Sequence, residues 1–426
     1  MCWPNESRIL LDGSTNLKAV IRKPHARYLF AFLLFSALLF LRRPAQLLNP
    51  QVWDEDGTQI VPGLIDHGVR SLVYPVNGYL VVLPKLISAT SLAISGLHYP
   101  LVSTVLAWLV TVAVCMFIAF SPTYLKGGIV LGAATLLVPC DPEVFGIPLY
   151  TFWWASLLLF LVVLWDENSN DVKLRTSFVV IGGLSSPMIF LVAPFLIVRA
   201  AVLKGKKREL LILSAALFCC GAQAIAMFHS AEPLAKGKMS WANLGYVLPK
   251  FVGGYLAGNY IRRTNHLVWI ATGVLGMFLL MAVPFIRRHP RYLYLIGLWC
   301  GTVYFIGRRV DLSVLQPRYA GPRYYFLPFV LLTWFLVSVM SESGWWKVRF
   351  FAAVLLVFSI FNMLPVRTRP QRDFEWAKHV ANCTASDPYS IPVSFDGQRP
   401  WYVVVNRGQC LALQRAGLIH MSTPGP

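Results

Sequence analysis

The chain has 426 residues, of which 56% are hydrophobic and only 13% are charged, and its formal net charge is +19. Soluble domains carry about 25% charged residues, so this composition, with a mean hydropathy of +0.58, excludes an ordinary soluble enzyme. Lys and Arg stand mostly in short loops between apolar stretches, which favours topology signals and anionic-lipid contacts over nucleic-acid binding. The composition therefore predicts an all-α polytopic membrane protein.

Eleven apolar stretches, each a candidate membrane-crossing helix, follow one another within residues 1–365 and predict a transmembrane domain there. A helix needs about 20 apolar residues to cross roughly 30 Å of hydrocarbon, so several stretches predict short or broken helices. The first stretch is not a cleavable signal peptide, because it starts far from the N-terminus and no small-residue cleavage site follows it. The stretches cover about residues 28–46, 79–97, 99–120, 127–139, 150–165, 176–198, 210–228, 266–286, 292–306, 324–340 and 349–365.

Short basic connections predict the orientation, since cytoplasmic loops are rich in Lys and Arg. The basic N-terminal arm and the connections at 204–208, 287–291 and 347–349 are therefore expected in the cytoplasm. An even number of crossings must then separate the arm from 204–208, and two arrangements meet this condition.

The two arrangements differ in segments 79–97 and 176–198. In the first arrangement each segment is a single span, which places Asp141 and Glu143 in the cytoplasm. In the second, 79–97 is an interfacial helix, and 176–198 breaks at the run Gly182-Gly183-Leu184-Ser185-Ser186-Pro187 into two short crossings. Such a break is tolerated where the backbone lines a buried cavity. We prefer the second arrangement, which sets Asp141 and Glu143 on the outer face.

A first outer loop at about 47–98 and a small C-terminal tail at 366–426 lie on the expected outer face. The tail is the only soluble-like part of the chain, and it is too short for a large independent core. Cys383 and Cys410 both lie in the tail and can pair if the tail faces an oxidising compartment.

The first candidate site is the run Trp53-Asp54-Glu55-Asp56-Gly57, which stands out because acidic residues are scarce in this chain. Three adjacent carboxylates raise one another's pKa unless cations neutralise them. One such group near the membrane surface is a reasonable general base for a hydroxyl nucleophile. The alternative is a solvated loop, or a helix start with acidic residues in its first turn.

The second candidate site is Cys140-Asp141-Pro142-Glu143, between two short apolar stretches. If it faces the same side as Asp56, Asp141 or Glu143 can orient an acceptor or hold a cation; the alternative is a plain loop. A divalent cation, Mg²⁺ or Mn²⁺, is thus a candidate cofactor that the sequence neither requires nor identifies.

The third candidate site is cationic, on the outer side, where few basic residues are expected. Arginine suits bidentate phosphate binding, so a lipid-linked phosphate is a natural partner. The alternative is that these side chains reach phospholipid headgroups. The candidate phosphate-binding residues are Arg308, Arg309, Arg318 and Arg323, the last of which opens a run at the mouth of an apolar stretch.

Together these motifs resemble the GT-C superfamily of polytopic membrane glycosyltransferases, in a bacterial branch. The resemblance covers the whole chain in outline and rests on short motifs. Besides residues 53–57, the matching runs are Ser71-Leu72-Val73-Tyr74-Pro75, Gly78-Tyr79-Leu80, Pro84-Lys85-Leu86 and Arg323-Tyr324-Tyr325-Phe326-Leu327-Pro328.

The resemblance implies a polyprenyl-phosphate sugar donor, a catalytic acidic residue in the first outer loop and a second one in the next outer loop. Carried onto this chain, the first falls on Asp56 or Glu55, with Asp54 as a third choice, and the second on Asp141 or Glu143. It also implies the interfacial helix that favours the second arrangement.

The expected activity is therefore inverting transfer of a sugar to a cell-envelope glycan or lipid acceptor, at the periplasmic face of a bacterial inner membrane. Arg323, with Arg318 or Arg308, is expected to stabilise the departing phosphate. Two alternatives are a lipid-linked polysaccharide polymerase or ligase, which does not need the early acidic run, and a glycolipid flippase or transporter. A transporter places ionisable residues near the bilayer midplane, whereas these stretches are almost free of acidic residues.

Overall fold

Helices make up most of the computed structural model, which describes residues 24–203, 206–230, 240, 243–258, 265–312, 315–317, 321–395 and 400–416. Within these residues, six helices are long and apolar enough to cross a membrane, and three more apolar helices are shorter. The expectation of a helical, membrane-embedded protein is therefore confirmed. The count of about eleven spans stays a prediction, because several apolar helices are shorter than the roughly 20 residues that a crossing needs.

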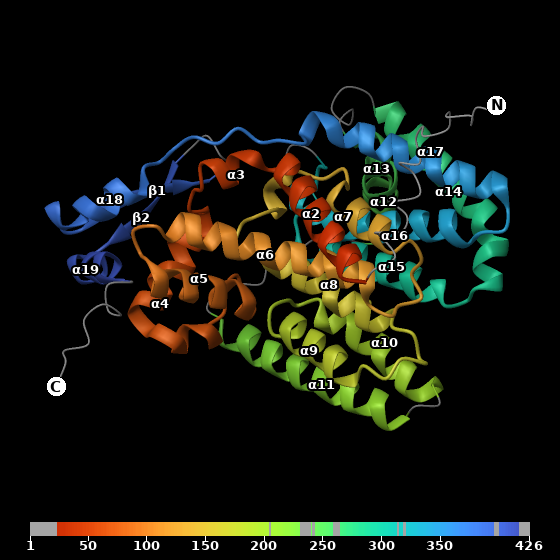
Figure 1. Ribbon diagram of the computed structural model, residues 1–426, viewed down its shortest axis with the longest axis horizontal. Coiled ribbons are helices and arrows are strands. Elements are labelled where there is room, and N and C mark those ends of the chain that lie inside the picture. Colours follow the sequence, from red (N-terminus) through yellow and green to blue (C-terminus); the bar gives the residue numbers. More distant parts are fainter. Residues whose placement is uncertain are drawn as a thin grey trace, which may run out of the picture.

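The chain runs through its elements in the following order (Figure 1). They are α2 (Pro24–Arg42), α3 (Pro44–Leu48), the π-helix η1 (Asp56–Ile60), α4 (Val61–His67), η2 (Gly68–Val73), α5 (Val82–Ile94), α6 (Tyr99–Phe120), α7 (Ile129–Leu136), η3 (Pro142–Val144), α8 (Thr151–Val163), α9 (Val172–Gly183), α10 (Ile189–Val202), α11 (Lys206–His229), α12 (Leu244–Val252), α13 (Gly254–Ala257), α14 (Asn265–Arg288), α15 (Tyr292–Arg309), η6 (Pro322–Tyr325), α16 (Phe326–Glu342), α17 (Trp346–Met363), η7 (Leu364–Val366), α18 (Trp376–Asn382), η8 (Cys383–Ala385), β1 (Tyr389–Ser394), β2 (Pro400–Val405) and α19 (Arg407–Arg415).

The two ends of α6 mark two ends of the molecule. Tyr99, the first residue of α6, packs against Trp376 of the tail with ring centroids 5.9 Å apart. Helix α6 has 22 residues and is therefore about 33 Å long. Its other end lies near Tyr124. There the Tyr124 amide donates to the Leu164 carbonyl over 3.0 Å, and Arg199 of α10 donates to the Tyr124 hydroxyl over 2.6 Å. The connections after α6 and α8 and the last part of α10 thus gather opposite the tail.

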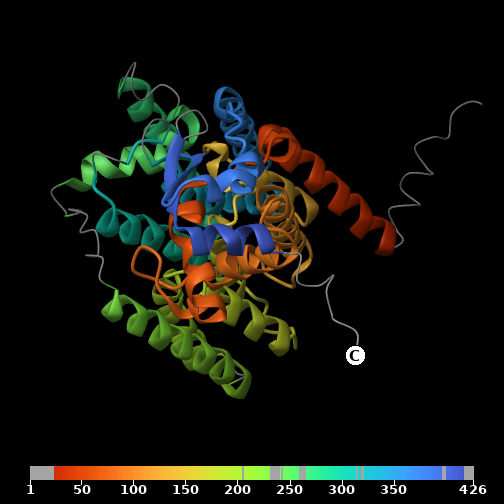
Figure 2. The same ribbon diagram turned by 90° about the vertical axis from the view of Figure 1, so that its left-hand side faces the viewer.

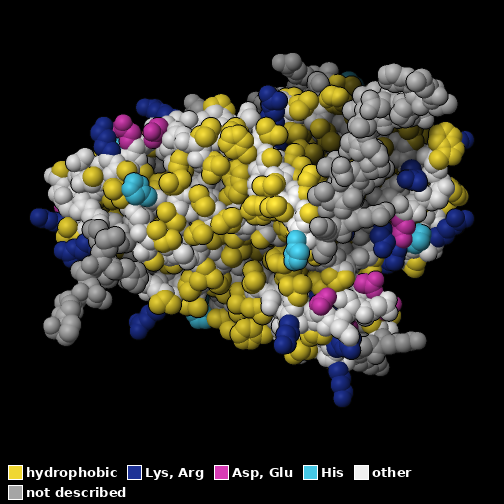
Figure 3. Space-filling view, viewed as in Figure 1, with side chains coloured by type: hydrophobic (Ala, Val, Ile, Leu, Met, Phe, Trp, Pro, Cys, Tyr) yellow, Lys and Arg dark blue, Asp and Glu magenta, His cyan; other side chains and the backbone are white. Residues whose placement is uncertain are grey.

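Side-chain chemistry follows the same axis. On the face in Figure 3, hydrophobic side chains cover the middle of the molecule, and most charged side chains lie towards its left end and its lower right. Charged groups are costly in hydrocarbon, so this distribution is typical of a protein whose middle lies in a bilayer.

The predicted break in segment 176–198 is present, since α9 ends at Gly183 and α10 begins at Ile189. Neighbouring elements pair the polar groups that the break exposes. Gln223 of α11 donates to the Gly183 carbonyl over 2.9 Å, and the Leu83 amide donates to the Ser185 hydroxyl over 2.9 Å. This internal pairing is what allows a helix to be interrupted within an apolar layer.

Helix α5, in the segment with two predicted roles, has 13 residues and is therefore about 20 Å long. Its Lys85 amine donates to the carbonyls of Ser71 and Tyr74, over 2.6 and 2.7 Å, which ties α5 to the preceding part of the first outer loop. These features agree with the second arrangement, in which this segment does not span.

The tail packs on the first outer loop at one end of the molecule (Figures 1 and 2). Strands β1 and β2 form an antiparallel pair, and the Ser394 amide of β1 donates to the Val52 carbonyl over 2.8 Å. The Trp376 indole donates to the Gly96 carbonyl over 3.0 Å. Cys383 and Cys410, whose pairing the sequence left open, form a disulfide that joins the end of α18 to α19.

We expect removal of this disulfide to loosen the tail, because a closed loop of this size stabilises a fold by about 2–4 kcal/mol. A Cys383→Ser/Cys410→Ser variant should lose the tail to limited proteolysis several-fold faster than the wild type. Cys300→Ser, which changes an exposed free cysteine, is the matched control and should behave like the wild type. Equal cleavage rates in all three proteins would contradict the proposed contribution of the disulfide.

Candidate active site

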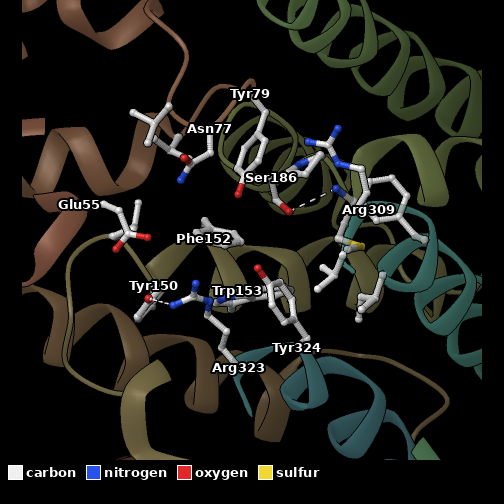
Figure 4. A pocket seen from close by; sticks show the side chains of 18 residues that line it. Glu55, Asn77, Tyr79, Tyr150, Phe152, Trp153, Ser186, Arg309, Arg323 and Tyr324 are labelled. Carbon is white, nitrogen blue, oxygen red and sulfur yellow. Dashed lines mark hydrogen bonds between the residues drawn. The ribbon is translucent and has the colours of Figure 1, made fainter. Parts of the chain in front are cut away.

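A cavity of about 320 Å³ lies between the first outer loop, the start of α8, the break between α9 and α10, the end of α15 and the start of η6 (Figure 4). Its volume is at the small end of the range for ligand sites. Its wall combines charged, polar and aromatic side chains. These are Glu55, Arg309 and Arg323, then Asn77 and Ser186, then Tyr79, Tyr150, Phe152, Trp153 and Tyr324.

Of the three adjacent carboxylates, only Glu55 reaches the cavity. It precedes η1, the π-helical turn, and π-helical turns often occur at functional sites. Its Oε2 atom is buried and accepts no hydrogen bond from the described part of the chain. Burial raises the pKa of Glu55, and the nearby Arg323 only partly opposes this effect. Glu55 is thus a carboxylate with a free oxygen, in contact with a ligand-sized space.

Asp56 lies behind the wall. Its side chain is 1% exposed, and its Oδ2 atom accepts a hydrogen bond from the Leu149 amide over 3.3 Å. Burial raises the pKa of Asp56 well above its ordinary value, because it disfavours the charged form. Asp56, the first choice of base from the sequence, therefore does not line the cavity and instead ties the first outer loop to the segment before α8.

Asp54 also lies outside the cavity wall, with 8% of its side chain exposed. Burial and the neighbouring Glu55 raise the pKa of Asp54 to about 7. Because electrostatic coupling is reciprocal, ionised Asp54 also makes ionisation of Glu55 harder. The three carboxylates therefore share one sequence run but occupy three different environments.

The second acidic site holds an arginine of the cavity wall. Glu143 Oε1 accepts a hydrogen bond from Arg323 over 2.6 Å and another from the Tyr150 hydroxyl over 2.7 Å. Arg323 also donates to the Tyr150 hydroxyl. Although burial opposes ionisation, Arg323 and then Arg369 keep the pKa of Glu143 below its ordinary value. Glu143 is therefore the ionised partner that fixes Arg323.

Asp141 supports this arrangement from behind. Its Oδ1 atom accepts a hydrogen bond from the Glu143 amide over 2.9 Å and one from Arg369 over 3.3 Å. Burial raises the pKa of Asp141, against the effect of Arg369. The structure thus places the second acidic pair beside arginines and not in the wall of the cavity.

The predicted phosphate-binding arginines divide into three groups. Arg309 and Arg323 both line the cavity, whereas Arg308 is exposed and does not. Arg318 lies outside the described residues. No carboxylate of the described residues forms an ion pair with Arg309. The cavity therefore contains one neutralised guanidinium group and one without an acidic partner.

Asn77 and Tyr79 are cavity residues that were not among the candidate site residues from the sequence, although Tyr79 lies in a run that carries the resemblance. They belong to a tight turn in which the Val76 amide donates to the Tyr79 carbonyl over 2.9 Å. Asn77 and Gly78 both have positive φ, 50° and 84°, the geometry that the Asn-Gly dipeptide adopts readily. That dipeptide was a visible signal for the turn, but not for its position at a cavity.

The candidate divalent cation finds no ready donor set. Among the described residues, no group of three or more His, Cys, Asp and Glu side chains could hold a metal ion. Of the carboxylates near the cavity, Glu143 and Asp141 pair with arginines, and Asp56 is buried behind the wall.

No protein-family model, curated protein or solved structure matches this chain. The geometry of the cavity is therefore the basis for its functional assignment.

We expect Asp56→Asn to remove a pH dependence of stability. The raised pKa means that folded Asp56 keeps a proton that the unfolded chain releases above its ordinary pKa of 3.8. Stability from this group is therefore complete below that value and is lost as pH rises. The difference in melting temperature between Asp56→Asn and the wild type should shift in favour of the variant as the pH is raised from 4 to 8. A wild-type advantage that grows with pH would contradict the raised pKa of Asp56.

Proposed function

We propose that this protein is a membrane glycosyltransferase of the GT-C type. It transfers a sugar from a polyprenyl-phosphate donor to a hydroxyl group of a cell-envelope glycan or lipid. The observation that carries the proposal is the presence, in one cavity, of a carboxylate with an unpaired oxygen and two guanidinium groups. Such a site can accept a proton on one side and stabilise a departing phosphate on the other.

Glu55 is the proposed general base. The acceptor oxygen attacks the anomeric carbon as its proton passes to Glu55, and the bond from that carbon to the phosphate oxygen breaks. The phosphate leaves with the bonding electron pair, and this direct displacement inverts the anomeric centre. Glu55 must be ionised to act, so its raised pKa predicts that activity is lost, as pH falls, at a higher pH than an unperturbed glutamate would give.

Arg309 and Arg323 are proposed to stabilise the phosphate. Glu143 holds Arg323 in place but also neutralises much of its charge. Arg309 has no acidic partner among the described residues and therefore brings the net positive charge. Charge-assisted hydrogen bonds from guanidinium groups are strong and suit phosphate oxygens. In Figure 4, Arg309 and Glu55 lie at opposite ends of the cavity, as attack and departure on opposite faces of a sugar require.

The aromatic part of the wall supports a sugar as the transferred group. Tyr79, Phe152, Trp153 and Tyr324 offer apolar ring surfaces, and all of them except Phe152 add a polar atom at the ring edge. A pyranose presents a C–H face and hydroxyl edges, so it can use both kinds of surface. The volume of about 320 Å³ suits one sugar with its phosphate better than a preassembled oligosaccharide.

We also propose eleven crossings of a bacterial inner membrane, with the cavity on the periplasmic side. Helices α7, α8, α9 and α10 are short. Each can cross only where the bilayer is locally thinned or where its ends line a cavity at membrane depth, as broken helices do. The disulfide in the tail supports an oxidising compartment on that side. The proposed crossings are α2, α6, α7, α8, α9, α10, α11, α14, α15, α16 and α17.

We predict that Glu55→Gln lowers the rate of sugar transfer by about 10²–10⁴-fold, the usual contribution of a general base. The assay is transfer from a radiolabelled polyprenyl-phosphate sugar by the purified protein in lipid vesicles. Asp56→Asn, one residue away, is the matched control and should keep near wild-type activity, because Asp56 does not line the cavity and an asparagine oxygen can still accept the hydrogen bond from the Leu149 amide. Full activity in Glu55→Gln would remove the proposed base and favour the polymerase or ligase alternative.

A further inference from the structure

The tail sends one side chain back to the active site. After α17, residues 367–375 run along the outer surface towards α18, and Arg369 turns inward from this segment. The side chain is 23% exposed, whereas its neighbour Arg367 is exposed and makes no ion pair with a described residue. The inward position of Arg369 is thus specific to this residue.

Arg369 and Arg323 contact the two oxygens of one carboxylate. Arg323 lies 2.6 Å from Glu143 Oε1, and Arg369 lies 3.6 Å from Glu143 Oε2. Arg369 also donates to Asp141 over 3.3 Å. The Glu143 carboxylate is 5% exposed, so water can do little to replace either partner. Removal of one partner of a buried ion pair is costly because the remaining charge loses its compensation.

Arg369 also contacts the acidic run of the first outer loop. The Arg369 guanidinium lies 5.6 Å from the centre of the Trp53 ring, and that of Arg43 lies 5.7 Å from it. The Trp53 indole donates to the Tyr150 hydroxyl over 3.1 Å, the same hydroxyl that meets Glu143 and Arg323. Trp53 is two residues from Glu55. Arg369 therefore contacts Trp53, which lies near the proposed base in the acidic run, and Glu143, which holds the cavity arginine.

The segment that carries Arg369 is itself held in place. The Gln371 side chain donates to Gln46 and to the Asn49 carbonyl, each over 2.8 Å. The Phe374 amide donates to the Gln51 side chain over 3.0 Å. These contacts join the tail to α3 and to the loop between α3 and η1, so the position of Arg369 is fixed relative to the acidic run.

We propose that Arg369 is a positioning residue of the active site, which holds Glu143 so that Arg323 stays in the cavity wall. The tail is then part of the catalytic unit and not only a cover over the first outer loop. This inference rests on the proposed function for its effect on catalysis, but the coupling from Arg369 through Glu143 to Arg323 does not depend on it.

The first experiment measures transfer by full-length Arg369→Gln, Arg369→Lys and Arg367→Gln. We expect Arg369→Gln to lower kcat by about 10–100-fold, as misplacement of a catalytic group by about 1 Å does, with the acceptor KM changed less than about twofold. Arg369→Lys should recover part of kcat because the charge remains. Arg367→Gln removes the same charge from the exposed neighbour and should match the wild type. A normal kcat in Arg369→Gln would overturn the catalytic part of the inference.

The second experiment reads the coupling without any transfer assay. Melting temperatures are measured for Arg369→Gln, Arg323→Gln and the double variant, first with Glu143 and then with Glu143→Gln. Both arginines are cations that share Glu143 as an acidic partner, so coupling through Glu143 predicts non-additive effects in the first set and much smaller non-additivity in the second. Additive effects with Glu143 present would overturn the inference. If the wild type shows no transfer but the melting temperatures show this coupling, the proposed function fails, whereas the coupling from Arg369 through Glu143 to Arg323 is supported.

Discussion

The site depends on one buried carboxylate, Glu143, at the boundary of the apolar bundle. A buried charge is stable only when partners compensate for it, and here the partners come from three distant segments: Arg323 before α16, Tyr150 before α8, and Arg369 in the tail. The ion pairs therefore fix three parts of the chain relative to one another. The cavity lies beside this junction, which holds Arg323 in the cavity wall.

The carboxylates near the junction illustrate how environment separates chemically similar groups. Burial raises the pKa of Asp56, while two arginines keep that of Glu143 below its ordinary value. Glu55 lies between these extremes, with a raised pKa and an oxygen free to accept a proton. Pairs of acids whose environments push their pKa values apart are a common feature of acid–base sites. This separation favours Glu55 over its two neighbours as the base.

Hydropathy and breaker residues were enough to predict the helical membrane fold and the break before Pro187, because both depend on local composition. The choice among Asp54, Glu55 and Asp56 could not be predicted, since the π-helical turn that follows Glu55 sets which side chain faces the cavity. The contact of Arg369 with Asp141 joins residues 228 positions apart. Nothing in the local pattern distinguishes Arg369 from Arg367, so only the packed structure reveals its contact.

The most direct test of the account is a density map of the protein in a lipid nanodisc with a non-hydrolysable polyprenyl-phosphate sugar bound. The account predicts phosphate density within hydrogen-bonding distance of Arg309 or Arg323, and the sugar ring between the aromatic side chains with its open face towards Glu55. Phosphate density at the opposite end of the bundle, beside Tyr124 and Arg199, or a Glu55 side chain turned away from the bound sugar, would contradict it.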